Sequence, residues 1–443
     1  MLLTLSVKNF QSFYEETVLD LQKRSFKTLR PRPGESWNEN IETRAAIFGA
    51  NASGKTTILK SLGLLRDAVL SSVTSDSSVE RMRVPHKLHT DEPTSFEVEY
   101  VTNDVRYLWA LHLDDDGVIS ETLKANPERN WRLIFSRNRD DVEFQPEAKL
   151  TRAIRENVQG FLAPWTLTLS AWLRVQSSSN HIQASRWWTN GVLPFIAGRE
   201  SEQYARHSWL IELASQNTAW MEVLRASLEF ADVGISGVSI EEKAPEKIRQ
   251  IHLLLHPDQP DLFGEEPEAY TEIRLKKEDV QDYLKYIEFK HSDASGKQFD
   301  LQESEESLGT RAWIDLAIPA FYALTQGSVL LIDEIDSSLH PVLVRELISF
   351  FNHAELNKHG AQLIFSSHDS TLVGRHPSEV LTRSEIWFVE KTATYSELFS
   401  LDEFPVRDSH NIEKRYLQGN YGAIPIVNSA QVTKILSLLA PST

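Results

Sequence analysis

The stretch GANASGKT occupies residues 49–56 and matches the pattern GxxxxGK[ST]. An apolar segment, Arg44–Phe48, precedes it, and apolar residues at helical spacing follow over Lys55–Leu70. The two glycines let the backbone wrap tightly, so that N–H groups converge on a bound anion at the start of a helix. We therefore predict a phosphate-binding loop between a strand and a helix. The alternative is a glycine-capped turn that only opens a helix.

The side chains of this loop fit a nucleoside triphosphate. Lys55 supplies a positive charge to the β- and γ-phosphates, and Thr56 offers a hydroxyl to Mg²⁺. We therefore expect ATP and Mg²⁺ as cofactors. The residues expected to bind ATP are Gly49, Ala50, Asn51, Ala52, Ser53, Gly54, Lys55, Thr56 and Thr57.

A second strand ends in two carboxylates. The apolar run Val329–Ile332 is followed by Asp333 and Glu334. A strand that is apolar on both faces is expected in the centre of a sheet, parallel to its neighbours. Ligands bind at the carboxyl ends of such strands, so Asp333 would hold Mg²⁺ and Glu334 would act as the general base on water. Alone, this run would be an ordinary strand end; the phosphate loop upstream favours the catalytic interpretation.

Three further motifs lie downstream of the phosphate loop, one before and two after this strand. They are ESLGT at 306–310, which opens an apolar helix, SSLHP at 337–341, and IFSSHD at 364–369, a strand that runs into a histidine. Together they resemble the signature, D-loop and switch-histidine motifs of ABC-type ATPases. The branch they resemble contains the chromosome-maintenance and recombination-repair ATPases, and VKNFQSF at 7–13 is similar to the start of that branch.

The resemblance implies a role for each matching residue. Ser307, Gly309 and Thr310 would contact the γ-phosphate bound to an opposing subunit. Ser338 would bridge the dimer interface, and His368 would sense the γ-phosphate. The resemblance thus implies a catalytic set of Lys55, Glu334 and His368, with Thr56 and Asp333 as the magnesium ligands.

Some positions depart from the pattern or allow a simpler interpretation. Thr310 stands where many ABC proteins have Gln, and Leu308 where many have Gly. Taken alone, Ser307 is typical of a helix N-cap and His368 of a loop after a strand. For the Q-loop glutamine, Gln176 is a candidate by position only.

A signature that acts on the opposing subunit implies a head-to-tail homodimer enclosing two nucleotides, or a higher oligomer built from such dimers. The sequence has no run of about 18 apolar residues, which disfavours a membrane protein and hence a transporter. Heptad arrays are also absent, unlike in the long chromosome-maintenance proteins.

Composition narrows the functional classes further. The chain has 443 residues, 46 Lys and Arg, 63 Asp and Glu, a net charge of −17 and no Cys. The lack of Cys excludes disulfides, thiol catalysis and Fe–S clusters and fits a cytoplasmic protein. The acidic balance disfavours DNA as a partner, because phosphate binding needs Lys and Arg. It favours a protein partner, and a basic effector would suit it by charge.

The expected fold class is α/β, an ABC-ATPase head with a mixed or parallel central sheet, an antiparallel β subdomain and a helical insertion. We expect an N-terminal lobe over 1–145, a mainly helical insertion over 146–270 and a C-terminal lobe over 271–443. Period-two alternation predicts an antiparallel meander over 95–144 with a turn at 114–117. Local patterns also predict the following elements: paired strands at 2–10 and 18–21, a mobile loop at 71–79, strands at 235–240 and 251–255, an acidic loop at 257–268, and a hairpin over 286–302 that turns at 293–296.

Two aromatic regions have alternative interpretations. The tryptophans between 165 and 220 are more typical of a core or dimer contact than of a ligand platform. Gly419, Tyr421 and Gly422 are consistent with a turn that closes the sheet. The run NIEKRYL at 411–417 with GNYGAIP at 419–425 also resembles the tail of stand-alone ABC/AAA-like ATPases of bacterial phage-defence and abortive-infection systems, such as the ATPase subunit of the PARIS system.

That second resemblance implies a nucleotide-gated sensor that controls a toxic effector encoded in the same operon, often a TOPRIM-type nuclease, with a phage protein as trigger. The alternatives are a DNA-repair ATPase acting at DNA ends or gaps, and a non-catalytic scaffold that uses ATP only to hold subunits together. DNA-stimulated turnover with steep salt dependence would indicate the repair enzyme.

Overall fold

The computed structural model divides into two compact units. The first comprises Met1–Ile196, Tyr322–Asp336 and Arg345–Thr443, and the second comprises Ala197–Phe321 and Ser337–Val344. The structure describes residues 1–128, 130–176, 179–196, 200–231, 234–242, 285–292, 297–375, 378–405 and 410–424. Each unit is described by itself below.

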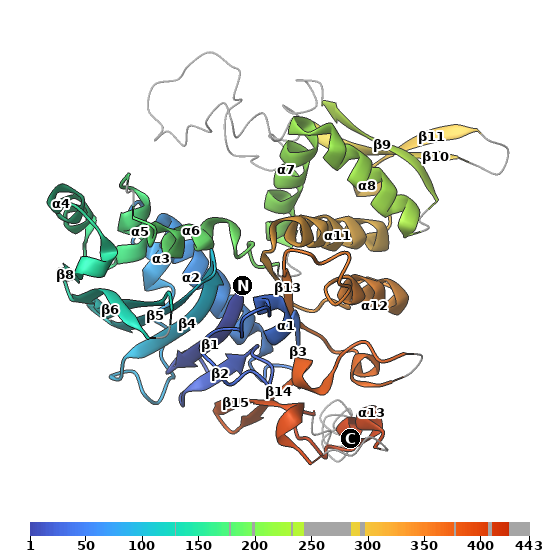
Figure 1. Ribbon diagram of the computed structural model, residues 1–443. Helices are drawn as coiled ribbons and strands as arrows, with labels where there is room; N and C mark the ends of the chain where they lie inside the picture. Colours follow the sequence, from blue (N-terminus) through green and yellow to red (C-terminus); the bar gives the residue numbers. More distant parts are fainter. Residues whose placement is uncertain are drawn as a thin grey trace, which may run out of the picture. The chain divides into compact units, whose positions relative to one another are not determined.

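A five-stranded sheet organises the first unit (Figure 1). Its order is β12 (Val329–Ile332), β13 (Gln362–Ser366), β3 (Arg44–Gly49), β14 (Ile386–Thr392) and β15 (Tyr395–Ser400). The first four strands run parallel, and β15 closes the sheet as an antiparallel hairpin with β14. Because β3, β12 and β13 are parallel neighbours, their carboxyl ends meet at one edge of the sheet.

The expectation that the acidic strand is central is wrong in one respect. Strand β12 is fully buried and parallel to β13, as predicted, but it is the terminal strand of the sheet. Single bridges of Val192 with Val329 and of Ile196 with Ile332 cover its outer edge. Asp333 N also donates to Ile196 O at 2.8 Å. The short segment 192–196 therefore covers the outer edge of β12, where a sixth strand would otherwise pair.

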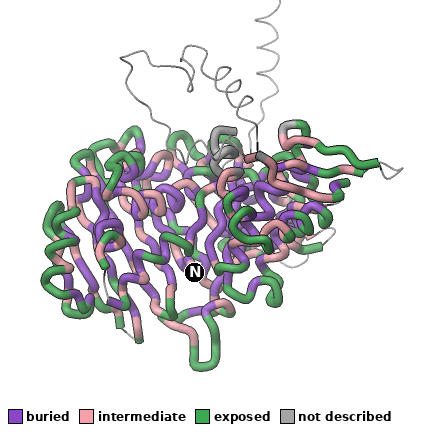
Figure 2. The backbone as a smooth tube through the Cα atoms, turned by 90° about the horizontal axis from the view of Figure 1, so that it is seen from above, coloured by how far each residue is buried: buried purple, intermediate pink, exposed green. Residues whose placement is uncertain are grey.

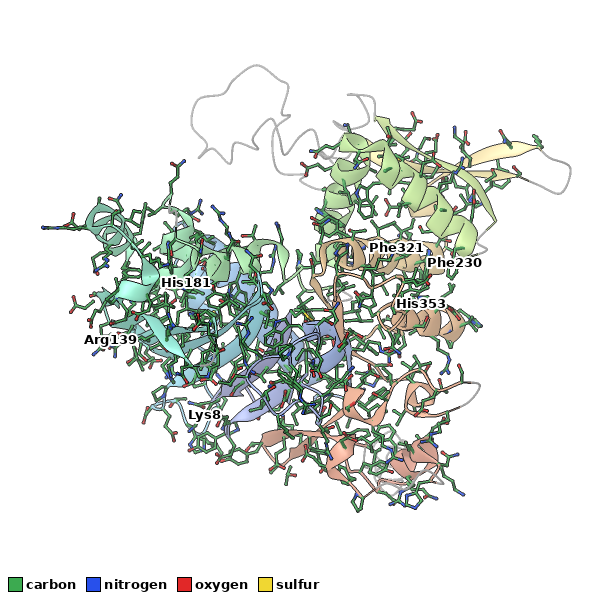
Figure 3. The ribbon with its side chains drawn as sticks, viewed as in Figure 1. Lys8, Arg139, His181, Phe230, Phe321 and His353 are labelled. Atoms are coloured by element: carbon green, nitrogen blue, oxygen red, sulfur yellow. The ribbon has the colours of Figure 1, made fainter. Side chains whose placement is uncertain are left out.

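The predicted antiparallel meander is confirmed and extended by the N-terminal strands. The second sheet of this unit has the order β2 (Thr17–Asp20), β1 (Leu2–Lys8), β4 (Thr94–Thr102), β5 (Val105–Asp114), β6 (Gly117–Asn126), β7 (Arg132–Asn138) and β8 (Asp141–Phe144). Most of its buried positions are apolar, and Figure 2 colours buried residues purple along the backbone. Arg139, in the turn after β7, pairs with Asp114 at the end of β5 (Figure 3).

Helices cover one face of this sheet. The phosphate-loop helix α2 (Lys55–Ser71) lies with α5 (Thr168–Leu173) and α6 (Ile182–Asn190) (Figure 1). Trp172, Trp187 and Trp188 are buried there, and Trp187 stacks on Tyr100 of β4 with ring centroids 4.3 Å apart. These tryptophans are core residues, as the pattern favoured.

The expectation of a mobile serine-rich loop at 71–79 is wrong. The segment forms a turn and the short helix α3 (Ser77–Glu80). Ser72 and Ser78 are buried, and Ser72 Oγ accepts a hydrogen bond from Leu167 N at 3.0 Å. Serine hydroxyls here satisfy buried backbone groups, a role that composition alone does not reveal.

The remaining elements of this unit are short. They are α1 (Trp37–Asn40), α4 (Arg152–Phe161), α13 (Ile412–Leu417), and the 3₁₀ turns η1 (Pro146–Ala148), η3 (Ser370–Val373), η4 (Arg383–Glu385) and η5 (Leu401–Glu403). Helix α12 (Pro341–Phe350) begins in the second unit and ends in the first. Tyr421 is buried and stacks on Phe388 of β14, so the described part of the tail closes the sheet as a turn.

The second unit combines helices with a small sheet. Its elements are α7 (Glu200–Gln216), α8 (Thr218–Phe230), η2 (Glu303–Glu305) and α11 (Leu308–Gln326, whose last residues belong to the first unit), with the antiparallel strands β9 (Ile235–Glu242), β10 (Lys285–Ser292) and β11 (Gln298–Gln302). Phe230 of α8 stacks on Trp313 of α11 (Figure 3). The predicted pairing over 286–302 is confirmed. Its turn at 293–296, the strand at 251–255 and the loop at 257–268 lie outside the described residues.

Among the residues that the structure describes, no helix combines the length and apolar character that a membrane span requires.

A buried carboxylate joins the meander to α5. Glu121 on β6 is fully buried and accepts hydrogen bonds from Trp109 Nε1 at 3.0 Å, Thr168 N at 2.6 Å and Leu169 N at 3.2 Å. It thus caps α5 from a neighbouring strand, and Arg137 lies 3.8 Å away. Glu121 thus accepts hydrogen bonds from free N–H groups at the start of α5 and also balances the buried charge of Arg137.

We expect Glu121→Ala to lower the free energy of unfolding by about 3–5 kcal/mol, because it leaves the buried charge of Arg137 without its counter-ion and the N–H groups of Thr168 and Leu169 without their acceptor. Urea unfolding followed by far-UV circular dichroism measures this. Glu143→Ala, an exposed acid on β8, is the matched control and should change the value by less than about 0.5 kcal/mol. Equal values for the two variants would contradict the prediction.

Candidate functional site

The phosphate loop joins β3 to α2 in a shape that requires its glycines. Gly54 has a φ of +119°, which strains any residue with a side chain. A Cβ at Gly49 would lie 2.5 Å from the carbonyl oxygen of Val389, so a larger residue cannot fit. The N–H groups of the first turn of α2 have no acceptor within the helix and are directed to its N-terminal end. The loop therefore has the form predicted for an anion site.

Lys55 is the cation of this loop. Its side chain is buried, and Nζ donates to the carbonyl oxygens of Gly49 at 2.9 Å and Ala50 at 3.1 Å. Burial lowers the pKa of Lys55, and the nearby carboxylates of Asp333 and Glu334 only partly oppose that shift. A desolvated ammonium held by carbonyl dipoles gains strongly from the approach of phosphate oxygens.

The two expected magnesium ligands lie in contact. Thr56 Oγ1 donates to Asp333 Oδ2 at 2.7 Å, although 277 residues separate them in the chain. Adjacent ligands of an octahedral Mg²⁺, each about 2.1 Å from the ion, lie about 3 Å apart. The pair therefore fits two neighbouring positions of that ion. In the described part of the chain no cluster of three acidic or histidine side chains could hold a metal. Mg²⁺ commonly takes few protein ligands and completes its coordination with water and substrate phosphate.

Glu334 has an unusual backbone. Its φ is +53°, in the left-handed region that costs a residue with a side chain about 1–3 kcal/mol. Its N–H donates to Ser366 Oγ at 2.8 Å, and the hydroxyl of Ser366 donates in turn to Asp333 Oδ1. The end of β13 thus fixes the turn that follows β12.

His368 lies beside Glu334. Its Nε2 is 3.7 Å from Glu334 Oε1, and both side chains are partly exposed, at 38 % and 55 %. Asp336 Oδ1 accepts from Ser367 Oγ at 2.7 Å and from His368 N at 3.2 Å. These bonds join the turn after β12 to the residues after β13 and hold the imidazole and the carboxylate together.

These groups line one cleft of about 680 Å³. Its lining residues are Gln11, Ser12, Asn51, Ala52, Ser53, Gly54, Lys55, Thr56, Thr57, Glu334, His368 and Lys391. Gln176 is not among them and lies in an exposed segment after α5. The glutamine at the cleft is instead Gln11, whose Oε1 accepts from Thr57 Oγ1 at 2.8 Å.

Sequence reasoning missed several supporting residues. No motif assigned a role to Ser396. Its hydroxyl nevertheless contacts Ser53 O and Ser12 Oγ, the latter at 2.8 Å, and so supports the phosphate loop from β15. Ser366 lies within the motif at 364–369, but that motif assigned a role only to His368. Gln11 had one signal, its place directly after the first strand, within the stretch that resembles the start of an ABC-type chain.

The signature and D-loop residues lie together in the second unit. Ser307 is the N-cap of α11, since its Oγ accepts from Thr310 N at 3.1 Å and lies 2.8 Å from Thr310 Oγ1. A Cβ at Gly309 would lie 3.6 Å from the carbonyl oxygen of Ser338, which places the two motifs side by side. Ser307 and Ser338 are exposed, and Thr310 is buried beneath Ser307.

We expect Asp333→Asn to abolish Mg²⁺-dependent turnover while nucleotide binding without metal is kept. An amide keeps the size of the side chain but loses the negative charge that a hard cation requires. Titration of a fluorescent ATP analogue with and without Mg²⁺ checks this. The wild type should bind more tightly with Mg²⁺, whereas the variant should show no gain. A full Mg²⁺ gain in Asp333→Asn would contradict the assignment.

The fold and the phosphate loop have the form of a P-loop ATPase head. The carboxyl ends of parallel strands present a phosphate loop, an acidic pair and a histidine at one cleft, and a serine-capped helix carries the signature. A family model described as "AAA domain, putative AbiEii toxin, Type IV TA system" matches residues 44–374. The chain belongs to this family of AAA/ABC-type ATPases.

Two of the similar solved structures are heads of Smc proteins. One, bound to the C-winged helix domain of ScpA, is 15 % identical over 94 % of this chain and 99 % of its own, with a TM-score of 0.42. The SMC head domain from Thermotoga maritima is 15 % identical over 90 % and 98 %, with a TM-score of 0.39. Comparison with curated proteins finds no match. These similarities are too low to indicate an activity or a partner.

Proposed function

We propose that this chain binds and hydrolyses ATP with Mg²⁺ and that turnover gates a toxic effector in a cytoplasmic anti-phage defence system. One observation carries the hydrolytic part of the proposal: Lys55, Glu334 and His368 line one cleft, and Asp333 contacts Thr56, which lines the same cleft. A phosphate loop alone would support binding. A carboxylate with a histidine at 3.7 Å supports hydrolysis as well.

In the proposed mechanism, Lys55 and the N–H groups at the start of α2 hold the β- and γ-phosphates. Thr56 and Asp333 would hold Mg²⁺, which supplies neutralisation of phosphate charge. Glu334 accepts the proton of the attacking water, and His368 orients that water or the γ-phosphate from the neighbouring strand end. The strained backbone of Glu334 keeps its carboxylate directed to the cleft.

We also propose a head-to-tail homodimer. Ser307 and Gly309 stand at the N-terminus of α11, a helix of 19 residues, where N–H groups and the helix dipole attract an anion. The exposed Leu308, 67 % accessible, lies within the signature motif, and the exposed Val342, 58 % accessible, follows the D-loop motif in the same unit. An apolar, anion-attracting surface of this kind suits contact with a second copy that carries bound ATP.

The defence role rests on the family and on the tail resemblance. The family is described by a putative toxin of a toxin–antitoxin system, and stand-alone ATPases of the PARIS kind carry a similar tail. The net charge of −17 favours a basic protein partner over DNA. The proposed partners are therefore an operon-encoded effector, such as a TOPRIM-type nuclease, and a phage trigger protein.

Phage challenge of cells that carry the chain with its operon neighbour tests the defence role. Wild-type chain should protect, whereas Lys55→Ala and Glu334→Gln should not. Unchanged protection in both variants would rule out ATP gating. Turnover measured with and without double-stranded DNA tests the repair alternative, which requires stimulation that falls steeply with salt.

A further inference from the structure

A buried carboxylate paired with a partly buried imidazole lies next to the signature in the second unit. Glu306, the residue before Ser307, is 8 % exposed. Its Oε1 is hydrogen-bonded to His291 Nε2 on β10, and its Oε2 accepts from Ser307 N at 3.1 Å. Both carboxylate oxygens are thus occupied, one by the sheet and one by the backbone of the signature.

The pair forms part of a continuous series of contacts. Phe299 on β11 stacks on the His291 ring with centroids 5.4 Å apart and planes at 15°. His291 bonds Glu306, Glu306 bonds the N–H of Ser307, and Ser307 Oγ caps α11 by accepting from Thr310 N. The hairpin β10–β11 is therefore connected by side chains to the first turn of the signature helix.

Burial of this carboxylate costs desolvation free energy unless its hydrogen-bond partners compensate for it. A carboxylate without a partner is expensive in the interior, and two polar groups on adjacent elements could be replaced by apolar residues without loss of stability. At the same time, Glu306 is close to a helix end that would bind phosphate, where a displacement of about 1 Å can cost a hundredfold in rate. Fixing both oxygens prevents that displacement.

We infer that His291 and Glu306 are positioning residues for the signature serine. They set the orientation of the Ser307 hydroxyl and N–H, so the geometry of the β10–β11 hairpin controls the rate of hydrolysis. The inference rests on the proposed function, because the signature matters only if ATP is hydrolysed. It adds a control element in the second unit that no motif indicates.

Steady-state hydrolysis and ATP-analogue binding test this on the full chain. We expect His291→Leu to lower kcat by about tenfold to a hundredfold, with the dissociation constant of the analogue at the phosphate loop within twofold of wild type. His291→Gln places an amide nitrogen near the position of Nε2 and should restore kcat to within threefold of wild type. Lys290→Gln, an exposed residue of the same strand, is the control and should leave kcat unchanged.

A double variant separates positioning from stability. His291→Leu with Glu306→Leu removes the pair without leaving a buried charge, so it should melt within a few degrees of wild type. We still expect its kcat to be reduced by about tenfold or more. Wild-type kcat in this double variant, or a wild-type kcat in His291→Leu, would overturn the inference. A wild-type chain that hydrolyses no ATP would instead refute the proposed function itself.

Turnover of a mixture of two variants distinguishes a defect in the signature from a general structural defect. Lys55→Ala has an intact signature, and His291→Leu has an intact phosphate loop, so a mixed dimer contains one complete site. An equal mixture should regain about a quarter of wild-type turnover, since half of the dimers are mixed and each has one of two sites intact. A mixture no more active than its components would count against a role of His291 in the signature.

Discussion

Lys55→Ala should abolish ATP hydrolysis and weaken ATP binding by at least about a hundredfold. The ammonium is buried, and its pKa is lowered by that burial, so it is poorly solvated where it stands. Phosphate oxygens would replace the two carbonyl contacts of Nζ with charge-assisted hydrogen bonds, which are about twice as strong as neutral ones. Loss of one such preorganised donor in a closed site costs about 10²–10³ in rate.

Isothermal titration with ATP and a phosphate-release assay measure the two effects. The fold should survive the substitution, because removal of the side chain also removes the cost of a desolvated cation. Lys60→Ala is the matched control, since Lys60 lies on the same helix outside the cleft. If Lys55→Ala hydrolyses ATP at more than a tenth of the wild-type rate, the loop is not the catalytic phosphate site.

Glu334→Gln should reduce kcat by about 10²–10⁴ while ATP affinity stays within threefold of wild type. Glutamine keeps the size of the side chain and its hydrogen-bonding reach to His368, but it cannot accept the proton of water. In the proposed mechanism the phosphate loop, not this carboxylate, holds the phosphates of the nucleotide. ATP should therefore remain bound and uncleaved, and a nucleotide-bound dimer should accumulate.

Single-turnover kinetics and size-exclusion chromatography with and without ATP check both parts. Glu346→Gln, an exposed acid on α12, controls for the change in net charge. Retention of at least a third of wild-type kcat by Glu334→Gln would show that another group acts on the water. Loss of ATP binding in this variant would show that Glu334 has a different role.

Much of the composition of the cleft was predictable, because the residues proposed to act there lie in short motifs of the sequence. Gly49, Gly54, Lys55 and Thr56 lie in one loop whose spacing is set by the shape of a phosphate, and Asp333 and Glu334 end one apolar strand. A strand that ends at the ligand edge of a parallel sheet must deliver its next residues to the ligand. Pattern and position thus specified these side chains before any tertiary contact was known.

Other parts could not be predicted, because nothing local distinguishes them. The place of β12 at the sheet edge depends on the segment 192–196, which follows α6 and carries no strand signal. Gln11 rather than Gln176 lines the cleft because β1 ends beside α2, a contact between distant parts of the chain. The serine-rich composition of 71–79 is typical of an exposed loop, but Ser72 and Ser78 are buried.

The sequence by itself determined the phosphate loop, the acidic strand end, the order of the motifs and the α/β class, because each depends on spacings of a few residues. Only the tertiary structure decided that Thr56 contacts Asp333, that Ser366 and Asp336 hold the catalytic turn, and that His291 holds Glu306. Those contacts join residues that are 15 to 277 positions apart. Hydrogen bonds over such separations follow from strand order and register, which a local pattern does not contain.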